Sequence, residues 1–503
     1  MILALLLAAA SSGKLVVVVV IDQLRYQDLL WLAPELGPKG FAGLGRPAPM
    51  RYDTVVTETA ADHAALATGT YAELNGIAGN RFWDGERGRE AVDDPACPVW
   101  GAHVGRSASA LRVPTVGDAF KLNTGGAGRV VSVAVKDRSA LFLAGPSADL
   151  ALWFEIETGQ MASSSCFAEA APDWLPRDGA AGFRNWVWTM SRPDVIVRLL
   201  PEPRAPGALP LYGMGDVFPH RIGNGAVDKR LFLAVRNSPA STTLALQAAR
   251  AAVKGLQLGE SGRTDLFMLA LSAVDGVGHQ FGTLARERVD TVLRMHDELG
   301  AFLAELRARL GPRLSVLLTS DHGLTPMEAD QKRLRVGQGG TENVDELLPR
   351  VEKTIVEELG PREGGWVAGI ESSTLELRKP FPRRALELAV EVLRREPGFF
   401  RVVAESEIDR AEPALRHAYF SGRSGQVMLV PRPLWTLKKR ADAADHGSPW
   451  NDDALVPLML QAPGFRLGRD AVFRATQVAP SLAALLDTAP PAAALDLPAI
   501  EHE

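Results

Sequence analysis

The run KLVVVVVIDQ at residues 14–23 limits the possible folds more than any other part of the sequence. It holds five valines and an isoleucine without a polar residue between them. Such a run is typical of a central strand in a sheet that is buried on both faces, as in parallel α/β proteins. Asp22 follows the run directly. A carboxylate at this point is either a turn or helix-capping residue, or a functional group at the edge of the sheet.

Other segments of the chain extend this pattern into a complete fold class. Further apolar runs, bounded by turn residues, lie at 130–135, 266–271, 314–318 and 455–460. Residues 238–259 and 286–311 between them have apolar residues at helical spacing, and each segment ends at glycine. The alternation predicts an α/β fold with a mostly parallel central sheet flanked by helices.

The length and composition of the chain fit one large domain with insertions. The chain has 503 residues, of which 46% are hydrophobic, which is enough for an extensive core. We predict a catalytic domain over residues 14–490. Two stretches interrupt its pattern and are expected to be inserted cap subdomains: one at about 81–235, and a small α+β cap at about 345–435.

The N-terminus predicts export. Residues 2–10 form an apolar block that ends in three alanines, so residues 1–13 are interpreted as a signal peptide and the protein as periplasmic or secreted. The block is too short to span a bilayer, and no integral membrane segment is expected. Export would allow Cys97 and Cys166 to pair, but the sequence leaves their pairing open. The net charge of −5 argues against nucleic acid as a specific partner.

Acidic residues and histidines gather at the ends of the predicted strands. Open parallel sheets build their ligand sites beyond the carboxyl ends of the strands, so these side chains are expected at one rim. Taken singly, each of them is better explained as a turn or capping residue, or as a packed or surface histidine. The residues are Asp22 after the first strand, Asp275 and His279 after 266–271, Asp321 and His322 after 314–318, and His446 before 455–460.

Together these residues predict a metal centre. Three carboxylates and three imidazoles at one rim would repel one another or stay unsatisfied without cations. Mixed nitrogen and oxygen ligands suit Zn²⁺, with Mn²⁺ or Fe as alternatives. Six ligands are too many for one tetrahedral zinc and about right for two. A metal pair ~3.5–4 Å apart is typical of in-line displacement at phosphorus.

A nucleophile is predicted in the segment TVVTETAADHAALATGTY at 54–71. The segment is expected to begin as a strand and to become a helix near Ala60. A hydroxyl at this junction would lie at a helix N-terminus, where the dipole and free N–H groups favour an anion. Thr57 and Thr59 are both candidates, and either could instead be a capping threonine. Contact with a divalent cation would make the hydroxyl a usable nucleophile.

A phosphate clamp is predicted in VAVKDRSA at 133–140, where Lys136 and Arg138 follow a buried strand. As a bare charge cluster this segment could also be a solvated turn. At the rim of a two-metal site, arginine would hold a phosphate in fork geometry and lysine would act as a point charge. The charges of two zinc ions, three aspartates and one alkoxide cancel. The lysine and arginine then balance a phosphomonoester dianion better than a singly charged diester.

At this point the motifs resemble a known family. VVIDQLR, TAADHA, NGIAGN, VKDRSA, SAVDGVGHQFG, LTSDHG and DHGSPW are similar to those of the alkaline phosphatase superfamily. Within it they resemble the phosphate-irrepressible, threonine-nucleophile alkaline phosphatases, which are related to type I phosphodiesterase/nucleotide pyrophosphatases. The resemblance runs from about Leu15 to Leu486. It implies that Thr59, rather than Thr57, is the nucleophile, and that Asn80, Lys136 and Arg138 bind the phosphate.

The resemblance also implies how two zinc ions per chain would be held. One ion would take Asp275, His279 and His446, and the other would take the set Asp22, Thr59, Asp321 and His322. Two positions depart from the family pattern. Asp62 stands where glycine is usual, and Asn75 stands where histidine is usual. We expect Asp62 to add negative charge near the nucleophile.

The function predicted from the sequence is a zinc-dependent alkaline phosphatase that hydrolyses small-molecule phosphate monoesters through a phosphothreonine. The alternative is a phosphodiesterase or nucleotide pyrophosphatase with the same two-metal site. A more remote alternative is a non-catalytic, metal-dependent phosphate-binding protein. The chain is expected to act as a monomer.

Overall fold

A nine-stranded sheet forms the centre of the protein. The computed structural model describes residues 13–438 and 443–503, so the predicted signal peptide lies outside the described residues except for Gly13. The strand order in the sheet is β22-β2-β20-β13-β1-β12-β7-β8-β9. Their bounds are β1 Leu15–Ile21, β2 Ala48–Arg51, β7 Val130–Ala134, β8 Leu150–Glu155, β9 Gln160–Ala162, β12 Asp265–Leu271, β13 Leu314–Thr319, β20 Leu455–Gln461 and β22 Phe473–Arg474.

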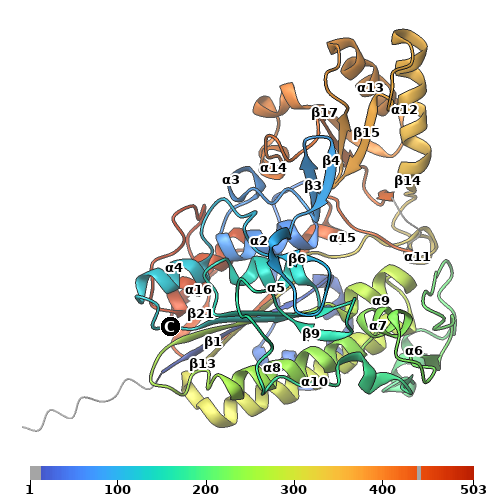
Figure 1. The fold of residues 1–503 in the computed structure, drawn as a ribbon. Helices are drawn as coiled ribbons and strands as arrows, with labels where there is room; N and C mark the ends of the chain where they lie inside the picture. Colours follow the sequence, from blue (N-terminus) through green and yellow to red (C-terminus); the bar gives the residue numbers. More distant parts are fainter. Residues whose placement is uncertain (1–12, 439–442) are drawn as a thin grey trace, which may run out of the picture.

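The valine run is the central strand, as its composition predicts. β1 pairs in parallel with β12 on one side and with β13 on the other. Val17 and Val19 pack into the layer that contains α8 (Ala240–Gly255) and α10 (Arg286–Leu310). Val16 and Val18 pack into the opposite layer, with α2 (Thr59–Thr68) and α5 (Asp137–Ala144). Figure 1 shows these helices on the two faces of the sheet. The α/β fold with a mostly parallel, helix-flanked sheet is therefore confirmed.

The direction of β20 determines where His446 lies. β20 runs antiparallel to β13, with Leu318 opposite Met459. The start of β20 therefore lies beyond the end of β13, at the rim where the parallel strands also end. A residue that precedes β20 thus reaches the same rim as residues that follow β1, β12 and β13.

The predicted strand at the beginning of 54–71 is wrong. Residues 54–58 are irregular, and α2 begins at Thr59 with Glu58 as its N-cap residue. The segment connects β2 to α2, and the cap subdomain packs against it: Val55 and Val56 form a small apolar cluster with Val403 and Met428. It is therefore buried by tertiary packing rather than by pairing in a sheet.

A second sheet stands above the central one and forms the cap (Figure 1). Its strands, in the order β15-β16-β18-β17, are antiparallel. Helices α12 and α13 share an apolar core with it. The bounds are β15 Val367–Glu371, β16 Thr374–Leu377, β17 Phe399–Ala404, β18 Val427–Pro431, α12 Val344–Leu359, α13 Arg383–Arg395 and α14 Pro413–Ala418.

The stretch 81–235 supplies both surface hairpins and part of the central sheet, because β7, α5, β8 and β9 lie within it. A disulfide joins Cys97 and Cys166, with 5.3 Å between their Cα atoms. It ties the strand β5 to the segment that follows β9.

None of the helices in the described ranges has the length and hydropathy of a membrane span.

The remaining helices are α1 Tyr26–Leu32, α3 Ala72–Asn75, α4 Val116–Asn123, α6 Pro193–Leu199, α7 Lys229–Arg236, α9 Ala273–Phe281, α11 Glu328–Leu334, α15 Asn451–Ala454 and α16 Val478–Leu485. The remaining strands are β3 Arg81–Asp84, β4 Arg87–Glu90, β5 Asp93–Pro98, β6 Gly105–Arg106, β10 Val187–Trp188, β11 His220–Arg221, β14 Thr341–Asn343, β19 Thr436–Lys438, β21 Phe465–Leu467 and β23 Ile500–His502.

Candidate metal centre and active site

The predicted carboxylates and histidines converge at one rim of the central sheet. Three groups of side chains there each bring three ligand atoms within 4.8 Å of one another. All six residues predicted at strand ends belong to these groups, which also include two residues that were not predicted as ligands. The groups are Asp22, His63 and Asp321; Asp275, His322 and His446; and His279, Asp445 and His446.

The first group is fully buried and lacks hydrogen bonds where a cation would bind. Asp22, His63 and Asp321 have no exposed surface. His63 Nε2 lies 3.6 Å from Asp22 Oδ1, and Asp321 Oδ2 lies 3.5 Å from the other ring nitrogen of His63. Asp22 Oδ1, His63 Nε2 and Asp321 Oδ2 have no hydrogen-bond partner within the described ranges. Unpartnered buried ligand atoms on three residues fit a bound cation, because each would otherwise remain desolvated without compensation.

The second group presents two neutral imidazoles to Asp275. The rings of His322 and His446 stack with centroids 3.6 Å apart. Burial lowers the pKa of His322 to about 3 and that of His446 well below its usual value. Their Nδ1 atoms lie 3.0 Å from the Gly323 carbonyl oxygen and 2.8 Å from that of Thr57. Each Nδ1–H therefore donates to a carbonyl and leaves Nε2 available as a ligand, the usual arrangement of metal-binding histidines.

The third group connects α9 with the loop before β20. His279 Nε2 lies 3.4 Å from Asp275 Oδ1, and its Nδ1 lies 3.8 Å from Asp445 Oδ1. Asp275 and His279 are one turn apart on α9, so their side chains lie on one face of the helix. Asp275 thus contacts both histidines that the resemblance assigns to the same zinc, since His446 Nε2 lies 3.9 Å away.

Neither His63 nor Asp445 is predicted as a ligand from the sequence. His63 lies four residues after Thr59 in the motif TAADHA, and Asp445 is the neighbour of His446. Helical periodicity was the available signal for His63. Residues 59 and 63 are four apart on α2 and share a face, so a nucleophile at 59 places His63 toward the same rim. No comparable signal in the sequence indicates Asp445, because it lies in an irregular loop.

Thr59 lies at the centre of this constellation. It is the first residue of α2, and its hydroxyl is 3.4 Å from His322 Nε2. The Lys136 ammonium donates to Thr59 Oγ1 at 3.1 Å. Thr57, the other candidate, is instead used structurally: its hydroxyl donates to the Ser448 carbonyl oxygen at 2.9 Å. Thr59 therefore has the position of a nucleophile, whereas Thr57 supports the loop that carries His446.

Lys136 links the two halves of the site electrostatically. Its Nζ lies 3.1 Å from Asp22 Oδ2 and 2.8 Å from Asp275 Oδ2. Burial opposes ionisation of Asp275, but the charges of Lys136 and His279 outweigh it and hold the pKa of Asp275 well below its usual value. Asp275 is therefore an anion at neutral pH and can bind a cation without losing a proton.

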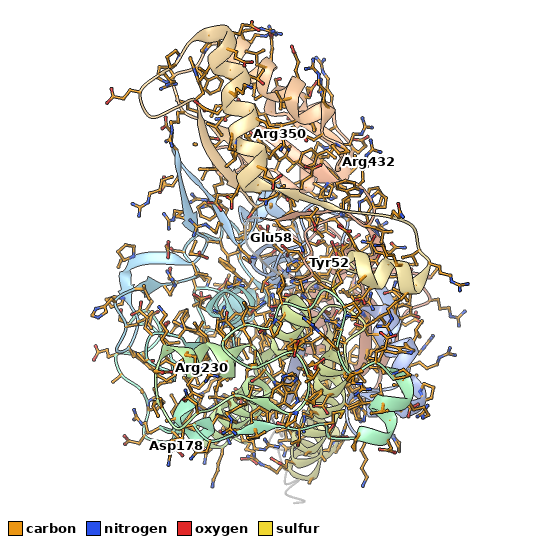
Figure 2. All side chains as sticks on the ribbon, turned by 90° about the vertical axis from the view of Figure 1, so that its right-hand side faces the viewer. Tyr52, Glu58, Asp178, Arg230, Arg350 and Arg432 are labelled. Carbon is orange, nitrogen blue, oxygen red and sulfur yellow. A yellow bond between two sulfur atoms is a disulfide. The ribbon has the colours of Figure 1, made fainter. Side chains whose placement is uncertain are left out.

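Asn80 is fixed beside the nucleophile by the start of α2. Its Oδ1 accepts a hydrogen bond from Ala60 N at 2.9 Å, which leaves the amide NH₂ as the free donor. Glu58 accepts from Asn80 N at 2.7 Å and from Ser372 Oγ of the cap at 2.9 Å. Figure 2 shows Glu58 where the cap meets the main body. Asn80, Lys136 and Arg138 line one cavity of about 660 Å³ together with Thr59.

The two departures from the family pattern have different structural explanations. The Asn75 Nδ2 donates to the Thr70 carbonyl oxygen at 2.7 Å, and its Oδ1 accepts from Ile77 N at 2.9 Å, so Asn75 closes a turn. Asp62 has no exposed surface, and neither of its oxygens has a partner in the described chain. Burial, together with Asp321 and Glu58, raises the pKa of Asp62 well above its usual value. The expected negative charge is therefore disfavoured by the surroundings of Asp62.

Asp62 makes the stability of the metal-free protein depend on pH. Its folded-state pKa is raised, whereas the unfolded carboxyl ionises near pH ~3.9. Its contribution to stability is thus fully present below that value and is lost as pH rises toward the folded-state pKa, by up to about 1.4 kcal/mol per pH unit. We expect Asp62→Asn to abolish this loss, since no hydrogen bond is broken. Urea unfolding of chelator-treated wild type and variant at pH 5 and pH 8 measures the free energy of unfolding. If the difference between variant and wild type is the same at both pH values, the prediction is contradicted.

The model of the type I phosphodiesterase/nucleotide pyrophosphatase family matches residues 16–449, and the chain belongs to this family. It is similar to alkaline phosphatase PafA of Elizabethkingia meningoseptica, with 26% identity over 525 residues that cover 96% of this chain and 93% of the relative. It is similar to alkaline phosphatase PhoV of Synechococcus elongatus, with 26% identity covering 95% and 90%.

A solved structure shares the whole fold. The crystal structure of alkaline phosphatase PafA matches with a TM-score of 0.88 and 24% identity, covering 97% of this chain and 98% of that chain. The cap subdomain is thus part of the shared architecture, because the coverage includes nearly all of both chains.

Proposed function

We propose that the protein is an alkaline phosphatase that hydrolyses small-molecule phosphate monoesters. The observation that carries the proposal is the position of Thr59. Its hydroxyl begins a helix, lies within hydrogen-bond distance of Lys136 Nζ, and adjoins the carboxylates and histidines of the rim. The names of the relatives PafA and PhoV support the same reaction.

We propose two zinc ions as the metals of the site. Asp275, His279 and His446 would hold one, and Asp22, Thr59, Asp321 and His322 the other. His63 and Asp445 adjoin these sets and are further candidates to contact or orient them. Bound there, the ions would lower the pKa of the Thr59 hydroxyl and stabilise the charge that develops on the leaving oxygen.

The chain's own residues then have definite roles. The Thr59 oxygen forms a bond to phosphorus as the bond to the alcohol oxygen breaks, which gives a phosphothreonine and the free alcohol. Water hydrolyses this ester in a second displacement and regenerates the threonine hydroxyl. The Asn80 amide, Lys136 and Arg138 contact the non-bridging oxygens, where negative charge is concentrated in phosphoryl transfer.

Lys136 and Arg138 favour monoesters over the alternative, phosphodiesters or nucleotide pyrophosphates, because two cations match a dianion. The family as a whole includes phosphodiesterases, so this preference is part of the proposal. Export to the periplasm or beyond and a monomeric state remain predictions from the sequence.

Metal content is the first test. Folded protein equilibrated with zinc and then desalted is expected to contain about two zinc ions per chain by elemental analysis. Asp321→Asn is expected to lower the content toward one, because an amide binds zinc more weakly than a carboxylate does. Chelation is expected to lower Tm, because a ligand at about 1,000 times its Kd adds about 4 kcal/mol of stability. Folded wild-type protein without stoichiometric metal would refute the two-metal site.

Thr59→Ala is expected to lower release of phosphate from nitrophenyl phosphate at least about 10⁴-fold, because the reaction loses its nucleophile. Thr59→Ser is the matched control: it keeps the hydroxyl and should retain most of the activity. Circular dichroism and metal content verify that both variants are folded. An alanine variant with a rate near that of wild type would remove Thr59 from the mechanism.

Lys136 and Arg138 are expected to discriminate between charge states. The double change Lys136→Met with Arg138→Gln should reduce kcat/KM for nitrophenyl phosphate about a hundredfold more than for bis-nitrophenyl phosphate, given the cost of removing an oxyanion contact. The two substrates share a leaving group, so their ratio reports the charge of the transferred group. Equal losses on both substrates would contradict the monoester preference.

A further inference from the structure

The cationic side chains that line the cavity with Thr59 differ in how closely carboxylates pair with them. Five cationic side chains line it: Arg81, Arg106, Lys136, Arg138 and Arg236. Three of them are each paired with two carboxylates. Arg81 pairs with Glu90 and Glu371, Arg106 pairs with Asp93 and Asp137, and Lys136 pairs with Asp22 and Asp275.

The other two cations, Arg138 and Arg236, are poorly neutralised. Arg138 has its sequence neighbour Asp137 at 3.8 Å, and its Nε is buried without a hydrogen-bond partner in the described chain. Arg236, the last residue of α7, has no ion pair with any residue in the described ranges. Burial, followed by the neighbouring charge of Arg138, lowers the pKa of Arg236. Two half-buried guanidinium groups with few close carboxylates thus line one cavity, and an anion bound there would gain charge-assisted contacts.

Arg236 ends α7, and the residue that follows it packs against α9. The next residue, Asn237, packs against Gly276 of α9 so closely that a Cβ on the glycine would lie 2.8 Å from its Cα. Arg236 is therefore fixed beside the helix that carries Asp275.

Tyr212 adds a second unusual feature at this end of the cavity. It lines the same cavity, and it has a φ of +58°, a left-handed conformation that is uncommon for a residue other than glycine. Its side chain lies near enough to Arg236 to affect the pKa of the guanidinium. Strained backbone of this kind tends to occur at ligand sites. The α9 end of the cavity thus combines a free cation with an aromatic side chain.

We propose that Arg236 binds a second anionic group on the leaving alcohol, so that the preferred substrates are phosphate monoesters whose alcohol also carries a carboxylate or a further phosphate. This inference rests on the proposed phosphomonoesterase activity, in which Asn80, Lys136 and Arg138 hold the transferred phosphoryl group. Displacement in line with Thr59 leaves the alcohol on the side opposite the nucleophile. Arg236 lines the same cavity as Thr59, so its guanidinium is available to an anion on the alcohol, and its fork suits carboxylate and phosphate oxygens.

The test uses two substrates that differ in one charge: 3-carboxyphenyl phosphate and its neutral isostere, 3-carbamoylphenyl phosphate. For the wild-type holoenzyme we expect kcat/KM to be roughly tenfold higher for the carboxylate, the size of one charge-assisted contact. Arg236→Gln should bring this ratio to about one. Arg236→Lys keeps the charge without the fork and should retain part of the preference.

Lys229→Gln is the matched control, because Lys229 is an exposed cation at the start of the same helix, α7. It should keep the wild-type ratio. A wild-type ratio near one would overturn the inference, as would an unchanged ratio in Arg236→Gln. Equal losses on both substrates in that variant would also overturn it, because Arg236 would then act on the transferred phosphoryl group. If wild-type enzyme released phosphate from neither substrate, the proposed function itself would fail.

Discussion

The burial of Asp22, Asp275 and Asp321 is the constraint on which the rest of the site depends. Asp22 and Asp321 have no exposed surface and Asp275 has 5%, and carboxylates so placed need opposite charge. The Lys136 ammonium, in contact with Asp22 and Asp275, supplies one charge. The oxygens of Asp22 and Asp321 that have no hydrogen-bond partner in the described chain require further positive charge. Bound cations would supply this charge. The strand ends, the neutral histidines and the lysine are arranged around this requirement.

Much of the fold could be predicted because the signals were local and strong. The valine run can be buried on both faces only at the centre of a sheet, and β1, Leu15–Ile21, lies within the predicted stretch 14–23. The position of the site residues at one rim could be predicted from the topology, because parallel strands place their carboxyl ends together. The antiparallel direction of β20 was not visible in its sequence, since an apolar run has no preferred direction. A parallel β20 would have placed the preceding His446 at the opposite rim, and the antiparallel direction is what brings it to the ends of β1 and β13.

The features that escaped prediction depend on contacts between distant segments. Residues 54–58 have the composition of a strand, but they are buried against the cap and pair with none of the described strands. Asp62 was expected to carry charge because ionisation is the default for a carboxyl in water. Its lack of partners, which disfavours the charge, is a property of the folded surroundings. In the sequence Arg236 is an ordinary helix-terminal arginine, and its lack of an ion pair within the described ranges distinguishes it from Arg81, Arg106 and Lys136 in the same cavity.

A strained turn of the cap contacts the residue that precedes Thr59. Ser372 and Ser373 connect β15 to β16 with φ values of +41° and +59°, where glycine or asparagine would be less costly. Such residues cost on the order of 1–3 kcal/mol each and persist where surrounding contacts hold them. Here the Ser372 hydroxyl reaches Glu58 and the Arg81 carbonyl oxygen, and Glu58 in turn holds Asn80 N. Because Glu58 precedes Thr59, the cap hairpin helps to fix both the start of α2 and the donor beside it. The late insertion thus helps to position the Thr59 hydroxyl and also forms a wall of the cavity.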